Sequence, residues 1–208
     1  MANVGPPCTG NTRWFALTGL LLTDLVDQDD KQSESGENDH DDLIATQYGM
    51  KYSNKEVDRI IKIIDYIPVQ LRTEGECQAT ESFSIRKGDH SLLEFAFDEQ
   101  DATIHRITLL ICEEYRRISQ LYCIPDDHRS GDVLAGTAGE INSQIFCCEI
   151  YPNAVRIIVS SDEISDRILS CNVFWELSGR GDLVSICILD STGKMSDHCF
   201  NELEANQT

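Results

Sequence analysis

The chain has 208 residues, of which 41% are hydrophobic, and it carries a formal net charge of −19 at pH 7. This length suits one large domain or two small ones. The excess of 36 acidic over 17 basic residues repels nucleic acid and anionic membranes and attracts basic partners, although solubility alone also explains acidic proteins.

No apolar run approaches the roughly 18 residues that a membrane span needs. Residues 1–12 lack the basic region of a signal peptide. We therefore expect a cytoplasmic protein with no nucleic-acid partner and no membrane partner.

Residues 1–26 are expected to form an N-terminal apolar arm, in which Trp14, Leu17, Leu21 and Leu25 recur at helical spacing. Residues 27–43 are expected to form an acidic flexible linker, because Asp27–Asp42 holds eight acidic residues and one lysine. Two interpretations of the arm stay open. It docks on its own chain, or it binds in a groove of a partner.

Residues 44–200 are expected to form an α+β domain, mainly of antiparallel sheet, followed by a polar tail that begins near Met195 and includes 201–208. Ser53 and Glu56 match a capping box, and an apolar stripe follows at Val57, Ile60, Ile61, Ile64 and Ile67. This pattern predicts one covering helix over residues 53–67, packed against the sheet.

Alternating segments after this helix predict hairpins that turn at Lys87–His90, at Tyr151–Asn153 and at Ser178–Asp182. The segment "FAFDE" resembles "VFWEL", and "IHRITLLIC" resembles "LVSICILD". An internal duplication, with halves at 44–123 and 140–192, is one explanation. The other is that any antiparallel meander looks self-similar.

The sequence contains no pattern that predicts catalysis. It has no GxSxG, no phosphate-binding glycine loop and no CxxC pair. Asp126–His128 lie on one loop and are a poor metal cluster, and His105 reads as a satisfied strand histidine. The nine cysteines are expected to be small buried hydrophobes, with redox or metal roles as the alternative. We expect no enzyme, no cofactor and no metal.

Acidic side chains in the predicted turns and loops are the candidate partner-binding residues, because such groups suit the masking of a basic protein surface. A solvated loop is the simpler explanation for any one of them. The candidates are Asp98, Glu99, Asp101, Asp126, Asp127, Asp162, Glu163, Glu176 and Asp182.

The segment "FAFDEQDATIHRITLLIC" resembles the bacterial immunity proteins of polymorphic-toxin and contact-dependent growth inhibition systems. The resemblance rests on Phe97–Glu99 and on the "I-x-x-I-x-L" strand at Ile104–Leu109, and "FWELSGRGDLVSICILD" repeats it. It covers Ser91–Cys112 and Leu169–Asp190. It implies a non-enzymatic antitoxin that neutralises a cognate basic toxin. The alternatives are a scaffold, adaptor or assembly subunit, and an enzyme of an unrecognised type.

Overall fold

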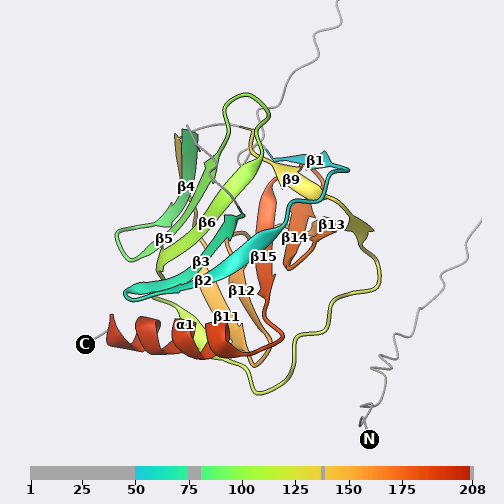
Figure 1. Cartoon of the computed structure of the whole chain (residues 1–208). Coiled ribbons are helices and arrows are strands. Elements are labelled where there is room, and N and C mark those ends of the chain that lie inside the picture. The colour runs from blue at the N-terminus through green and yellow to red at the C-terminus, as the bar shows by residue number, and fades with distance from the viewer. Residues whose placement is uncertain (1–49, 75–80, 137–138, 207–208) are drawn as a thin grey trace, which may run out of the picture. The chain divides into compact units, whose positions relative to one another are not determined.

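Two large sheets face each other in the computed structural model of the chain, which describes residues 50–74, 81–136 and 139–206 (Figure 1). The first sheet has the strand order β10-β4-β5-β6-β3-β2, and the second has the order β7-β11-β12-β15-β14-β13-β8. The remaining strands, β1 and β9, pair with each other. Together with the helix α1 (Lys194–Ala205), which follows the last of these strands, these sheets confirm the α+β class.

The strands of the first sheet are β2 (Arg59–Ile64), β3 (Ile67–Thr73), β4 (Glu81–Lys87), β5 (Ser91–Phe97), β6 (Ile104–Ile111) and β10 (Gly139–Asn142). Those of the second are β7 (Tyr115–Arg117), β8 (Arg129–Ser130), β11 (Cys147–Tyr151), β12 (Ala154–Ile158), β13 (Ile164–Ser170), β14 (Val173–Ser178) and β15 (Leu183–Leu189). The small pair is β1 (Lys51–Ser53) and β9 (Asp132–Leu134).

One hydrophobic core lies between the two sheets. Along each strand of the first sheet, alternate residues are buried. Phe83 on β4 and Phe95 on β5 are two of them, and their rings stack with centroids 4.5 Å apart. Phe95 also lies 6.2 Å from the ring of Trp175 on β14, so side chains of the two sheets meet. This alternation of buried and outward positions follows from the two-residue period of a strand.

The two sheets share the same connectivity. In each, a hairpin (β2–β3 or β11–β12) lies beside a three-stranded meander (β4–β5–β6 or β13–β14–β15), and the last strand of the meander pairs with the second strand of the hairpin. In each, a short parallel strand, β10 or β8, adds to the first strand of the meander. The matched segments "FAFDE" and "VFWEL" occupy equivalent strands. The shared order supports the duplication hypothesis, whose boundaries stay a prediction.

The prediction of a helix over residues 53–67 is wrong. This segment contains the edge strand β2 and the turn at Asp65–Tyr66, which leads into β3. Its isoleucines fit a helical stripe, but β-branched side chains favour strands, and periodicity cannot separate the two in a short apolar run. This hairpin is the equivalent of the one that turns at Tyr151–Asn153.

Within the described residues the helix is α1 (Lys194–Ala205). A polar tail was expected here, and this expectation is also wrong. Met195, Cys199 and Leu203 recur every four residues and are buried in the common core. Asp190 receives hydrogen bonds from the backbone N–H of Met195 at 2.7 Å and from Thr192. This carboxylate therefore caps the first turn of α1.

Among the described residues, no helix has both the length and the apolar character needed to cross a bilayer. The predicted arm (1–26) and the whole of the predicted linker (27–43) lie outside the residues that the structure describes.

Candidate functional site

Five of the predicted acidic residues lie on two connections between strands. Asp98, Glu99 and Asp101 are in the β5–β6 turn, and Asp162 and Glu163 are in the β12–β13 connection. We call these five residues the acidic end. All are exposed except Asp98, which is half-buried.

A series of contacts through the small β1–β9 pair links the two connections. Ala102 in the β5–β6 turn accepts a hydrogen bond from the N–H of Ala135 at 2.9 Å, directly after β9. On the other side, Gly181 in the β14–β15 turn lies against the carbonyl of Met50, at the start of β1, and has a φ of +81°. Arg180 in the same turn pairs with Asp162 at 3.4 Å.

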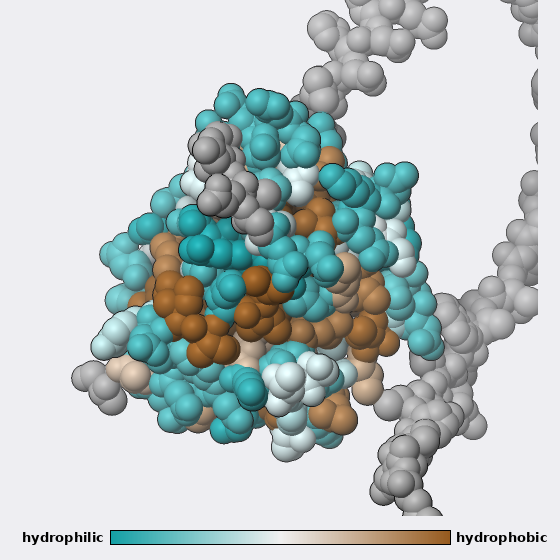
Figure 2. Space-filling model, in the orientation of Figure 1, coloured by the Kyte–Doolittle hydropathy of each residue, from teal (hydrophilic) through white to brown (hydrophobic). Residues whose placement is uncertain are grey.

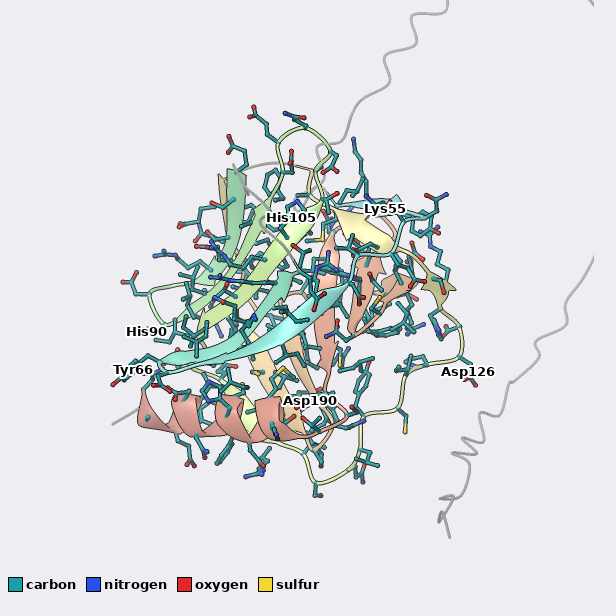
Figure 3. The ribbon with its side chains drawn as sticks, viewed as in Figure 1. Lys55, Tyr66, His90, His105, Asp126 and Asp190 are labelled. Carbon is teal, nitrogen blue, oxygen red and sulfur yellow. The ribbon has the colours of Figure 1, made fainter. Side chains whose placement is uncertain are left out.

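Asp98, Asp101 and His105 form a small cluster of possible metal ligands, whose ligand atoms all lie within 4.8 Å of one another. Asp101 accepts a hydrogen bond from the N–H of Thr103, and this bond holds the pKa of its carboxyl below the ordinary value. Lys55 and His105 add favourable charge at this carboxyl, and Figure 3 shows both on the upper part of the molecule.

Asp126 and Asp127 lie apart from the acidic end, on the loop before β8 (Figure 3). Asp127 pairs with Arg167 on β13 at 2.6 Å, and Asp126 is exposed. The structure therefore does not bring all the predicted residues into one surface.

Glu176 lies within β14 and not in a turn, and Asp182 lies in the β14–β15 turn with a buried side chain, so the prediction that both are surface residues is wrong. Glu176 is 3% exposed on β14, and Asp182 is fully buried. Arg180 pairs with Asp182 at 3.1 Å, and Arg156 pairs with Glu176 at 2.5 Å. Long arginine side chains cover these carboxylates, which a reading of turn positions alone cannot reveal.

Glu176 belongs to a row of alternating charges across the second sheet, which we call the charge ladder. Arg156 bridges Glu176 and Glu149, with its second contact at 3.5 Å. Beyond Glu149 comes Arg116, and beyond Glu176 comes Arg167 at 3.4 Å. Two buried carboxylates are thus compensated by three guanidinium groups, which satisfies the requirement that buried charges be paired.

The ladder carries hydrogen-bonded groups with shifted acidities. Burial alone would raise the pKa of Glu149, but hydrogen bonds from Arg116 and from the Tyr151 hydroxyl at 2.7 Å hold it below its ordinary value. Burial, with the charge of Glu149, raises the pKa of Tyr151 to about 12. These shifts keep Glu149 ionised and Tyr151 neutral at pH 7.

Sequence reasoning missed the ladder and also missed a group of cysteines. Glu149, Arg156 and Glu176 were readable as polar residues within apolar strands, which is a signal for a paired buried charge. Cys112, Cys148 and Cys199 are all buried and belong to one hydrophobic core cluster. Their wide separation along the chain gives no spacing motif.

No protein-family model matches the chain, and no curated protein matches it either.

Proposed function

We propose that the chain is a binding protein that neutralises a basic protein partner, as an immunity protein does with its toxin. The observation that carries this proposal is the distribution of charge. Within the part of the chain that the structure describes, every arginine except Arg72 is held in an ion pair. The pairs belong to Arg59, Arg86, Arg106, Arg116, Arg117, Arg129, Arg156, Arg167 and Arg180.

Because these arginines are held in ion pairs, the excess carboxylates of the chain determine the electrostatic field around it. Fields of this kind steer oppositely charged partners and raise association rates. The acidic end concentrates five carboxylates on two connections, and loops held by a rigid sheet are common binding sites. A basic protein surface is the partner that this chemistry fits.

The test starts with affinity capture of the tagged full chain from its native cells, with elution by rising salt and identification of the bound protein. The affinity of the purified pair is then compared for wild type and for Asp98→Lys with Glu163→Lys. We expect a basic partner whose activity the chain inhibits. The charge reversals should slow association at least tenfold, with an effect that shrinks at high salt.

The matched control reverses two exposed carboxylates of α1, with Asp197→Lys and Glu204→Lys. These changes alter the net charge equally but lie on a different element, so they should have a smaller effect. An acidic partner, or equal effects from both pairs of reversals, would refute the role of the acidic end.

The edge strand β2 favours a second candidate function, that of an assembly subunit. Ile63 is 51% exposed and Tyr66 is 83% exposed, and Figure 2 shows apolar side chains gathered across the middle of the face in view. Among the described strands, β2 pairs only with β3. An apolar edge strand of this kind is a template for strand pairing.

Light scattering during size-exclusion chromatography tests this second candidate. An assembly subunit should self-associate with increasing concentration, and Ile63→Lys should abolish association. Lys87→Glu, on β4, is the control and should leave it intact. A monomer at all concentrations would remove self-assembly as the function.

A further inference from the structure

The edge strand β2 separates two hollows of the surface, and alternate residues of the strand line each of them. Ile61 and Ile63 line a hollow of about 380 Å³, which we call the inner hollow. Ile60 and Lys62 line another of about 480 Å³, which we call the outer hollow. This division follows from the two-residue period of a strand, which sends successive side chains to opposite faces of a sheet.

The inner hollow lies between β2 and the connection that leads from β15 into α1. Leu189 and Met195 line it together with the two isoleucines, so it has an apolar side. Ile63 is 51% exposed there. Figure 1 shows β2 at the end of the first sheet, crossing above α1. An apolar side chain that entered this hollow would cover these groups and remove their surface from water.

The outer hollow is locally positive. Besides Ile60 and Lys62 it is lined by Arg72, Thr73 and Glu74. Within the described ranges, Lys62 and Arg72 take part in no ion pair, although every other arginine there does. Both side chains are exposed. Two cations against one carboxylate thus stand out on a chain whose net charge is −19.

The hydrogen-bonding edge between the two hollows is unpaired in the described part of the sheet, because β2 pairs only with β3. Both ends of the strand are held in place. Arg59 at its start donates to the carbonyl of Ile104 at 2.8 Å, and beyond its end the N–H of Tyr66 donates to Glu202 at 3.0 Å. A fixed strand with one unpaired edge is a template for an added strand.

We propose that β2 binds an extended segment of a partner protein in which acidic and apolar residues alternate. The segment adds a strand to the first sheet. Its apolar side chains enter the inner hollow beside Ile61 and Ile63, and its carboxylates lie over the outer hollow, where Lys62 and Arg72 neutralise them. Backbone hydrogen bonds supply affinity, and the alternate side chains supply specificity. This inference is independent of the basic partner proposed for the acidic end.

The experiment follows the fluorescence anisotropy of a labelled peptide of about eight alternating valine and glutamate residues, titrated with the full chain at low salt. A matched peptide carries lysine in place of glutamate. We expect the glutamate peptide to bind roughly tenfold more tightly or better, with an affinity that falls at high salt. The net charge of the chain alone would favour the lysine peptide, so the expected order identifies local recognition.

Variants and hydrogen exchange locate the site. Lys62→Glu combined with Arg72→Glu should weaken binding of the glutamate peptide by roughly tenfold or more. Lys51→Glu with Lys87→Glu is the control, because it changes the net charge equally on β1 and β4, and its effect should be much smaller. The bound peptide should also slow the exchange of backbone amides in β2.

Methylation of the peptide backbone tests strand addition itself. A strand donates hydrogen bonds to one neighbour from alternate residues only. N-methyl groups on either the valines or the glutamates should therefore abolish binding, and N-methyl groups on the other set should leave it nearly intact.

Several outcomes would overturn the proposal. They are equal binding of the glutamate and lysine peptides, unchanged affinity in the Lys62 and Arg72 double variant, and equal effects of the two sets of N-methyl groups. Self-association through β2 that excludes the peptide would also overturn it, and light scattering at the concentrations used detects this. None of these results bears on the basic partner, because Lys62 and Arg72 are not part of the acidic end.

Discussion

Arg156 connects the two buried carboxylates of the charge ladder. Its guanidinium contacts Glu149, Glu176 and the hydroxyl of Ser185, and its side chain is 22% exposed. Removing one member of such a network leaves the remaining buried charges without a partner. The resulting loss of stability is larger than the net stabilisation that the intact pair gives relative to apolar residues. The ladder therefore makes Arg156 more important for stability than the exposed arginines.

Replacement of this residue tests the argument. Arg156→Leu should lower the free energy of unfolding by about 3 kcal/mol, because Glu149 and Glu176 lose their shared partner. Arg117→Leu is the control. Arg117 pairs with Asp197 on the surface, and its loss should cost under about 1 kcal/mol. Urea denaturation of both variants gives the comparison. Equal losses would show that the ladder contributes no more than a surface ion pair.

At the scale of the element, the stability of α1 depends on the strand that precedes it. Burial alone would raise the pKa of Asp190, but hydrogen bonds from Thr192 and from the N–H of Met195 hold it below the ordinary value of 3.8. A depressed pKa of this kind stabilises the fold above the unfolded-state pKa. The stabilisation is lost as the pH falls through the folded-state pKa, below 3.8.

Asp190→Asn should therefore destabilise the protein by about 1 to 2 kcal/mol at pH 7, through loss of the charged cap. The difference from wild type should shrink as the pH falls below 3.8. Denaturation at a series of pH values measures it. Asp197→Asn, an exposed change in the first turn of the same helix, should cost less. A difference that stays constant down to low pH would contradict the cap.

The elements also show how far the sequence alone can lead. Hairpins such as β5–β6 and β14–β15 were predictable, because their alternation and turn residues are local signals. The strand β2 was not predictable, since Ile60, Ile61 and Ile64 fit both the 3.6-residue period of a helix and the two-residue period of a strand. The burial of Glu176 depends on Arg156 and Arg167 from other strands, and the burial of Cys199 depends on the packing of α1. Such contacts are set by tertiary packing.

At the scale of the whole molecule, the repeated connectivity does not make two independent domains. The core combines residues of both sheets, such as Phe95 and Trp175. The buried ion pair of Arg59 with Asp132, at 2.7 Å, also joins β2 of the first sheet to β9. Small units that share one core lack enough buried apolar area to fold separately.

Separate expression of residues 43–123 and 124–208 tests this conclusion. Each half alone should show the poor amide dispersion of an unfolded chain in NMR spectra, and the full chain should unfold in one cooperative transition. Mixing the halves should restore dispersed spectra if their interface is enough to fold them. A half that folds alone would show that the shared core is not required.

The position of β15 has a consequence for biosynthesis. This strand lies between β12 and β14 in the second sheet, although it comes after both of them in the sequence, and α1 follows it. A ribosome that has made the β11–β12 hairpin and β13–β14 cannot yet have supplied the strand that joins them. The second sheet therefore cannot close until β15 has been made, which leaves the facing edges of β12 and β14 open to chaperones until then.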